Sequence, residues 1–282
     1  MNNWIIYAVA SLFQLSLLMA LYKVPSAKQI NKYTFSAWQY FVASFLAGIF
    51  LYSSIFFDLK TLFLSFLWGT GFTILSLFQM HVLHKQDTSS LFPFTSLASN
   101  ILVTIGGVLF LNEVITFVQW IAVSLSILLF IAQYWNNKIH FVIEVLPSFM
   151  FISLLSTFNK FVQKAGADQV NVYNFIFWQL VFALIAALVI LFYKKETPSL
   201  KELTHGHMIK WSIIAGALQA GTTYTIVKAL SLGPISLVYI ILGLYTFFTS
   251  LLASLFFKEK ITGKSLIFIF LSFLIVLLIK FG

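Results

Sequence analysis

The sequence predicts an all-α integral membrane protein of ten transmembrane helices, built as two inverted repeats of five helices each. Three observations predict this fold: the composition, the spacing of the apolar runs and an internal repeat. Hydrophobic residues make up 60% of the chain and charged residues 9%, with a mean hydropathy of +0.97, whereas soluble proteins contain roughly 25% charged residues. A fold in water could not bury so much apolar surface, so we expect a lipid bilayer around this one.

The apolar runs fit ten crossings of the bilayer. One crossing needs about 20 apolar residues, and the 282 residues allow ten such runs with short connections. The first run follows no basic stretch and precedes no small-residue cleavage site, so we interpret it as a mature span rather than a secretion signal. The predicted spans are 4–22, 33–57, 62–81, 91–111, 117–135, 142–162, 173–193, 208–230, 235–257 and 265–281.

The charge and the missing residue types narrow the function classes. The net charge is +9 and the chain contains no arginine and no cysteine. The lysines lie mostly in loops between apolar runs, where they anchor helix ends to lipid headgroups, so we expect no nucleic-acid partner. The sequence also lacks a phosphate-binding glycine loop, a zinc motif and a nucleophile triad. We therefore expect no cofactor, no metal and no catalytic residue.

An internal repeat divides the chain into residues 1–136 and 137–282. The first matched block pairs Trp38-Gln39 with Trp178-Gln179, and the second pairs 109–116 with 255–262 through a shared Glu-x-Ile-Thr. Matching Asn and Tyr residues precede the first block: Asn31 and Tyr33, and Asn171 and Tyr173. Because five spans is an odd number, the two halves should enter the membrane in opposite senses. Such halves can rock against each other around a substrate held near the midplane.

The turn motif points to a known family. The segments Leu-Asn-Glu113-x-Ile-Thr and Phe-Lys-Glu259-x-Ile-Thr, each after the fourth span of a half, resemble the drug/metabolite transporter superfamily, and within it the EamA-like ten-span transporters. The resemblance implies a secondary transporter, most often an exporter, of small metabolites such as amino acids or nucleobases. It also implies a central cavity lined by spans one, three, four, six, eight and nine, and it does not fix the substrate.

The motif residues have two interpretations. Glu113 and Glu259 are expected to cap the tight turn by accepting N–H bonds at the start of the next helix, with ion coupling by their carboxylates as the alternative. The Trp-Gln pairs are expected to be structural, because Trp suits a membrane interface and Gln can bond a neighbouring helix.

Polar side chains at mid-membrane depth are the candidate substrate-binding residues, since burying them without a partner is costly. Their amides, hydroxyls and rings suit a neutral or zwitterionic organic solute, although each could instead make an interhelical hydrogen bond worth about 0.6 kcal/mol. Asn100 and Gln219 are the first choices. The full candidate set is Asn100, Gln219, Gln14, Thr223, Tyr224, Tyr245, Thr104 and Gln79.

Coupling to protons through a buried carboxylate is not expected. Small multidrug exporters of the same superfamily use a glutamate in the first span, where this chain has Gln14, and no acidic residue lies at a span centre. Facilitated diffusion or exchange fits better. His81 and Lys160 could titrate, but both are predicted near span ends, where snorkelling to the interface is the simpler account.

The leading hypothesis is therefore an exporter of a small organic metabolite that works by alternating access in a bacterial cytoplasmic membrane. A membrane-embedded enzyme, for which His205 and His207 are the only histidine pair in a loop, and a non-transporting scaffold or sensor are the alternatives. The orientation stays open. Most lysines lie in the odd-numbered loops, which places both termini outside by the positive-inside rule, whereas the resembled exporters keep both termini in the cytoplasm. The substrate, the coupling ion and the oligomeric state also stay open.

Overall fold

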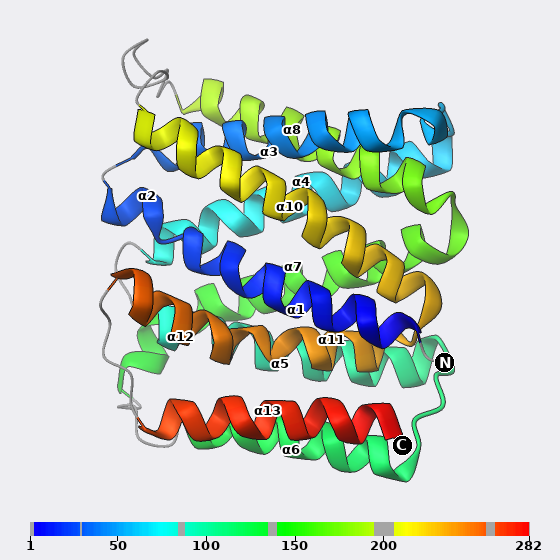
Figure 1. Cartoon of the computed structure of the whole chain (residues 1–282), viewed down its shortest axis with the longest axis vertical. Helices are drawn as coiled ribbons and strands as arrows, with labels where there is room; N and C mark the ends of the chain where they lie inside the picture. The colour runs from blue at the N-terminus through cyan, green and yellow to red at the C-terminus, as the bar shows by residue number, and fades with distance from the viewer. Residues whose placement is uncertain are drawn as a thin grey trace.

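The computed structural model describes residues 3–28, 30–83, 88–134, 140–194, 206–257 and 263–281. Within these ranges the regular structure is helical throughout and contains no strand. The elements, shown in Figure 1, are α1 (Asn3–Leu21), α2 (Val24–Ala27), α3 (Lys32–Leu51), the 3₁₀ turn η1 (Tyr52–Ser54), α4 (Leu59–Leu83), α5 (Thr88–Phe110), α6 (Phe117–Tyr134), α7 (His140–Gln169), α8 (Val172–Tyr193), α10 (Gly206–Leu232), α11 (Ile235–Gly243), α12 (Tyr245–Phe257) and α13 (Gly263–Phe281).

Each predicted span coincides with helical structure, with three differences. The short helix α2 lies where a loop was predicted, and α7 continues to Gln169 instead of ending near residue 162. The predicted span 235–257 consists of two helices, α11 and α12, which are separated at Leu244. The first difference is peripheral, whereas the other two shape the cavity described below.

Within the described ranges, five helical segments are long and apolar enough to cross a membrane: Asn3–Leu21, Lys32–Ser54, Leu59–His81, Val172–Tyr193 and Ile235–Phe256. Shorter apolar segments follow at Ala98–Phe110, Phe117–Leu129 and Phe270–Phe281. Helices α7 and α10 are long but less apolar, because they carry several of the polar residues that face the interior. The helices thus support an integral membrane protein, and the count of ten crossings remains a prediction.

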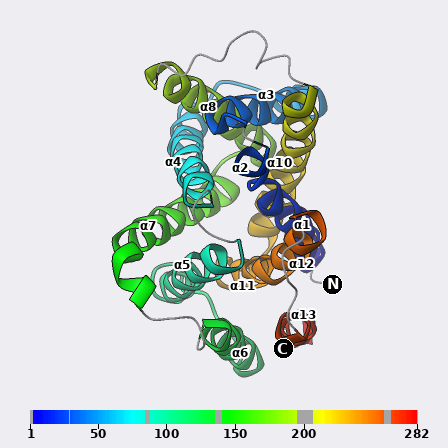
Figure 2. The ribbon, with the colours of Figure 1, turned by 90° about the vertical axis from the view of Figure 1, so that its left-hand side faces the viewer.

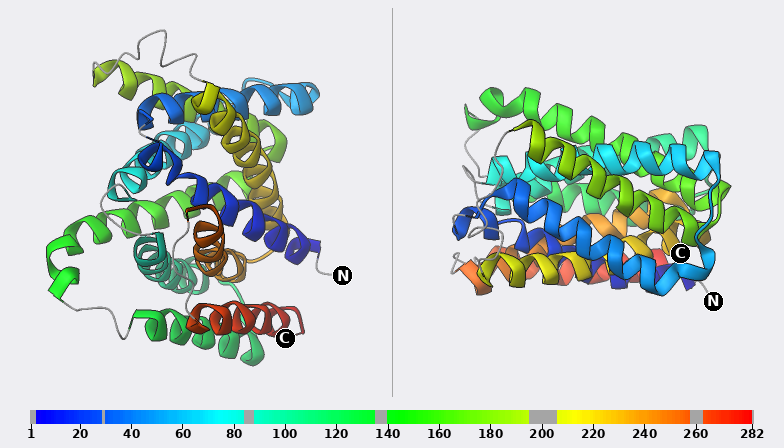
Figure 3. Two further views of the ribbon diagram at one scale, coloured as in Figure 1. Left: turned by 60° about the vertical axis from the view of Figure 1, so that its left-hand side comes forward. Right: turned by 90° about the horizontal axis from the view of Figure 1, so that it is seen from above.

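The helices lie side by side with their axes roughly aligned (Figures 1 and 3). Figure 2 shows α3 and α8 at one end of the long axis and α6 and α13 at the other, with the remaining long helices between them. The N- and C-terminal ends of the chain lie at the same side of the helices (Figure 1). The middle of the molecule is therefore built from both halves of the sequence.

Two glycines allow pairs of helices from opposite halves to approach closely. A Cβ on Gly69 of α4 would lie 2.7 Å from the carbonyl oxygen of Gln179 on α8, and a Cβ on Gly216 of α10 would lie 2.6 Å from that of Gln39 on α3. Small residues at such interfaces are what allow membrane helices to pack backbone to backbone. Gln39 and Gln179 are partners in the predicted repeat, so the two close contacts occur at matching positions.

The structural roles predicted for the Trp-Gln pairs hold in part. The amide nitrogen of Gln39 donates to Gln219 Oε1 on α10 at 3.2 Å and to the Tyr22 hydroxyl at 3.3 Å, which confirms a bond to a neighbouring helix. Trp178 Nε1 donates to the Phe56 carbonyl at 3.2 Å. The buried amide of Gln179 has no hydrogen-bond partner among the described residues, so the prediction fails there.

Glu113 is a helix cap, but not of the helix that the sequence predicted. Its carboxylate accepts the backbone N–H of Ile235, and both the N–H (3.1 Å) and the hydroxyl of Ser236, at the start of α11. Helix α6, the next in sequence, is instead capped by Thr116 and Gln119, which exchange side-chain and backbone bonds at 3.0 and 3.3 Å, as in a capping box. Glu259 lies outside the described residues.

The tight turn leaves Glu113 free to reach the other half. Asn112 has a positive φ of 52°, a conformation that Asn tolerates better than most residues, and the N–H of Glu113 bonds back to the Gly107 carbonyl at 3.2 Å. The α5–α6 turn is therefore fastened to the start of α11.

Replacing Glu113 by Gln should destabilise the protein. In this variant an amide NH₂ group replaces one carboxylate oxygen. Because NH₂ is a donor and cannot accept a backbone N–H, at least one buried donor loses its partner, at a cost of about 1–3 kcal/mol. We expect a clearly lower thermal unfolding midpoint in detergent. Asp168→Asn is the matched control, because Asp168 is exposed and pairs only with Lys164 one turn away. Equal midpoints for the two variants would contradict the capping role.

Replacing Gly69 by Ala should also destabilise the protein, although Ala is the better helix former by about 1 kcal/mol. The new methyl group would meet the backbone of α8, which cannot move aside as a side chain can, and such overpacking costs about 1–3 kcal/mol. Gly48→Ala is the control, because its nearest contact is the Phe177 ring at 3.5 Å. The unfolding midpoint should fall for Gly69→Ala alone, and a rise for both variants would rule out the close approach.

Candidate functional site

A cavity of about 110 Å³ lies between helices of both halves. This volume equals that of roughly three to four molecules of liquid water, at about 30 Å³ each. The wall is formed by residues of α1, α4, α5, α7, α10, α11 and α12. These are the helices at the positions that the family resemblance names as cavity-lining. The cavity is therefore central and is shared between the two halves.

One wall of the cavity is a break in a helix. Helix α11 ends at Gly243 and α12 begins at Tyr245, and both of these residues line the cavity. Around Leu244 the hydrogen bonds are of the tighter i→i−3 kind, from Leu244 N–H to the Ile241 carbonyl and from Phe247 N–H to the Leu244 carbonyl, at 3.2 Å each. Mid-helix 3₁₀ turns often mark hinges, and discontinuous helices often form the binding sites of transporters.

Helix α1 holds this break in place. The hydroxyl of Ser16 donates to the Tyr245 carbonyl at 3.3 Å, and the hydroxyl of Thr249 donates to the Ser16 carbonyl at 3.2 Å. Backbone groups that a broken helix leaves without internal partners must be satisfied by neighbours at membrane depth. The two hydroxyls make such bonds between α1 and α12.

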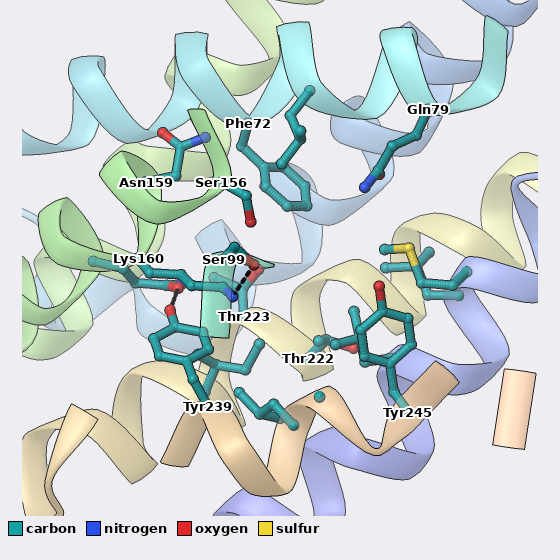
Figure 4. A pocket seen from close by; sticks show the side chains of 18 of the residues that line it. Phe72, Gln79, Ser99, Ser156, Asn159, Lys160, Thr222, Thr223, Tyr239 and Tyr245 are labelled. Atoms are coloured by element: carbon teal, nitrogen blue, oxygen red, sulfur yellow. Dashed lines mark hydrogen bonds between the residues drawn. The ribbon is translucent and has the colours of Figure 1, made fainter. Parts of the chain in front are cut away.

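A lysine forms the polar end of the cavity. Lys160 Nζ donates to the Ser99 hydroxyl at 2.7 Å (Figure 4) and to Asn100 Oδ1 at 2.6 Å. It also lies 4.9 Å from the centroid of the Tyr239 ring, within the range of a cation–π contact. Among the lining residues in the described part of the chain, Lys160 is the only charged side chain. The snorkelling interpretation is therefore wrong, because the ammonium group faces inward.

Further polar groups line the cavity. The Tyr239 hydroxyl donates to Gln163 Oε1 at 2.8 Å. Three lining residues carry buried polar atoms without a hydrogen-bond partner in the described structure: both amide atoms of Asn159, the Gln163 Nε2 atom and the Thr222 hydroxyl. Because most buried polar atoms in folded proteins are paired, these groups are suited to receive a solute or water.

The opposite end of the cavity is aromatic and aliphatic. Phe72 stacks on Trp68 with ring centroids 4.6 Å apart and planes 9° apart. Phe72 and Tyr245 stand on opposite walls, with Gln79 beyond them on the side away from Lys160 (Figure 4). A solute could thus place a polar group beside Lys160 and an apolar body between the rings.

The structure brings five of the eight predicted site residues to this cavity: Asn100, Gln219, Thr223, Tyr245 and Gln79. On α10 the lining positions 219, 222, 223 and 226 share one helix face, as expected for residues three and four apart. Gln219 is itself hydrogen-bonded, accepting from Gln39 and donating to the Thr223 hydroxyl at 3.1 Å. Its position on this face fits the prediction for α10.

The other three predicted residues lie elsewhere. Gln14 accepts a bond from the Thr225 hydroxyl at 3.0 Å between α1 and α10, and the Thr104 hydroxyl bonds back to the Asn100 carbonyl at 2.9 Å. Tyr224 is on another face of α10, near the rings of Tyr7 and Tyr173, and lines a separate apolar hollow of about 550 Å³ between α3, α8 and α10. Depth along a span therefore identified polar residues but not the face they occupy.

The resemblance implied that the sixth span lines the cavity, but sequence reasoning named no site residue on this helix, α7. Ser156, Asn159, Lys160 and Gln163 all line the cavity and lie at helical spacing. The predicted span ended at residue 162 and so placed Lys160 at its edge, whereas α7 continues to Gln169. The run of polar residues at i, i+3, i+4 and i+7 was the available signal. His81, the other predicted titrating group, is exposed near the end of α4, where its Nδ1 lies 3.1 Å from Lys32 Nζ.

Comparison with known proteins supports the predicted family. Residues 145–281, nearly half of the chain, match the EamA-like transporter family, which confirms the resemblance over the second half. No curated protein matches the chain. Among solved structures, 28 chains match. One of them, described only as the crystal structure of a protein, superposes with a TM-score of 0.70 over 95% of both chains at 12% identity. At this identity the likeness shows the fold alone.

The unpartnered amide of Asn159 leads to a prediction about stability. Asn159 is 3% exposed and makes no side-chain hydrogen bond in the described structure, so Asn159→Leu should leave the thermal unfolding midpoint unchanged or raise it. Asn100→Leu should lower the midpoint, because Lys160 loses its Oδ1 partner, at a cost of about 1–3 kcal/mol. A lower midpoint for Asn159→Leu than for Asn100→Leu would mean that Asn159 has a structural role.

Proposed function

We propose that the protein is a secondary transporter, and specifically an exporter, of a small organic metabolite such as an amino acid, a nucleobase or a related compound. In this proposal the protein lies in a bacterial cytoplasmic membrane. The observation that carries the proposal is the central cavity with unpartnered polar groups, formed by helices of both halves. The match of residues 145–281 to a transporter family favours transport over an enzymatic or scaffolding role.

The transport step that we propose is alternating access by residues 1–136 against residues 137–282. Matching features in the two halves support an inverted repeat. Asn31 caps α3 through bonds to the N–H groups of Tyr33 and Thr34, and Asn171 caps α8 through bonds to those of Tyr173 and Asn174. The close contacts at Gly69 and Gly216 pair α4 with α8 and α10 with α3. Two similar halves on opposite sides of one cavity can rock against each other, so that the cavity opens first to one side of the membrane and then to the other.

The position of the chain ends supports an even number of crossings, which ten spans require. The two ends lie at the same side of the helices (Figure 1). We further propose that Asn100, Gln219, Thr223, Tyr245 and Gln79 contact the solute. In this proposal the remaining candidates, Gln14, Thr104 and Tyr224, support the helices that carry the site. The break at Leu244 gives one wall a point about which it could bend during transport.

The proposal is tested by the metabolites that cells release. Cells that express the wild type should accumulate one compound or a small chemical class in the medium. Cells with the double variant Asn100→Leu/Gln219→Leu should not, because the change removes two polar groups from the cavity wall. Untargeted mass spectrometry of the medium at matched expression measures the difference.

Ser126→Ala is the matched control for this experiment. Ser126 is a buried polar residue of α6 that bonds only to the Val123 carbonyl and lies away from the cavity, so this variant should behave as the wild type does. Media that cannot be distinguished between wild type and double variant, with both proteins present in the membrane, would count against export. Uptake of small metabolites into vesicles that contain the protein would then be measured.

A further inference from the structure

We propose that the solute is an organic monoanion whose carboxylate binds at Lys160, with an apolar body that lies toward Phe72 and Tyr245. This inference rests on the proposed transport function and specifies its substrate class. It departs from the neutral or zwitterionic solute that the sequence predicts, because that prediction placed Lys160 at a span end rather than in the cavity.

The cavity contains a positive charge without an opposite charge beside it among the described residues. Lys160 makes its hydrogen bonds to two neutral oxygens, of Ser99 and Asn100, and has no acidic partner within the described structure. An uncompensated charge in a low-dielectric interior is costly, and neutral dipoles offset only part of that cost. The described acidic side chains lie elsewhere: Asp58 in the loop before α4, Glu113 in the α5–α6 turn against the start of α11, and Asp168 near the end of α7. An anionic solute would provide the missing opposite charge.

The donors around Lys160 match a carboxylate. A lysine ammonium group has three N–H donors, of which the neutral partners accept two, and a carboxylate has about four acceptor positions. Asn159 and Gln163, on the same face of α7, each carry an amide nitrogen that has no partner in the described residues, and the Thr222 hydroxyl is also unpaired. Two unused donors, those of Asn159 and Gln163, therefore lie on the helix that carries Lys160, the only cation in the described cavity wall. The Thr222 hydroxyl lies farther along the cavity, beside Tyr245 (Figure 4).

The rest of the wall limits the size and the charge of the solute. A phosphate monoester carries a charge of about −1.5 to −2 at pH 7, which one lysine matches poorly, and the chain has no arginine for bidentate recognition. The volume of about 110 Å³ is below the 300–1,000 Å³ typical of sites for drug-sized ligands. Amines without a carboxylate would meet Lys160 as a like charge.

The test measures thermal stabilisation of the purified full-length protein in detergent by three probes of one shape: 3-methylbutanoate, 3-methylbutanamide and 3-methylbutylamine. A ligand that binds the folded state stabilises it by an amount that grows with the logarithm of its concentration over Kd, so at one concentration the tighter ligand raises the unfolding midpoint more. We expect stabilisation by the acid and little by the amide or the amine. Lys160→Met should weaken binding of the acid at least about tenfold, the usual value of a charged hydrogen bond.

Lys228→Met is the matched control. Lys228 lies over the Tyr173 ring at 4.2 Å, outside the cavity wall, so its removal should leave binding of the acid unchanged. The inference is overturned by equal stabilisation from acid and amide, by unchanged binding of the acid to Lys160→Met, or by an acid that does not stabilise the wild type. The comparison of acid and amide needs no variant, so it decides the question even if Lys160→Met does not fold.

These outcomes are separate from the test of transport. Release of a neutral, zwitterionic or purely cationic compound that depends on Asn100 and Gln219 would overturn the anion inference and leave the exporter proposal standing. Conversely, binding of the acid at Lys160 without any released compound would support the site and remove the support for export.

Discussion

The structure depends on one constraint: at membrane depth, a backbone or side-chain polar group has no water to bond with and must find its partner within the protein. Regular helices satisfy most backbone groups by themselves, and the exceptions are handled individually. Asn31 and Asn171 cap the starts of α3 and α8, Glu113 caps α11, and Ser16 and Thr249 bridge α1 to the broken helix. Unpaired buried polar atoms also occur elsewhere, as at Gln179, but those of Asn159, Gln163 and Thr222 lie in the wall of the central cavity.

Close packing and the cavity are two results of the same choice of residue sizes. Glycines at 69 and 216 bring α4 and α10 onto α8 and α3, where backbone contacts leave no space. One turn farther along α4 and α10, larger side chains such as Phe72 and Gln219 line the cavity. The same two helices thus serve as the tightly packed frame and as the wall of the site.

Much of the fold could be predicted from the sequence, because apolar run length reports helix length directly. The site was predicted less well, and particular residues show why. Gln219 and Asn100 line the cavity, in line with their depth along the predicted spans. Tyr224 and Gln14 have a suitable depth but lie on other helix faces. A single sequence does not specify which face of a helix turns toward the cavity. Glu113 was expected to cap its neighbour in sequence, and its true partner lies 122 residues away. Lys160 was misplaced because the estimated helix end was seven residues too early. The break at Leu244 has only Gly243 as a local signal, and many membrane helices contain glycine.

The cap that Glu113 provides has a consequence for how the chain is made. The carboxylate oxygens belong to an early part of the chain. The N–H group of Ile235, from which they accept a hydrogen bond, is synthesised 122 residues later. At about 5–20 residues per second, the carboxylate waits roughly 6–24 s for its partner while helices of the second half enter the bilayer. During this interval the first half holds an acidic group without its final ligand, which delays completion of its assembly until the second half arrives. The second part of the chain is therefore needed to complete the packing of the first.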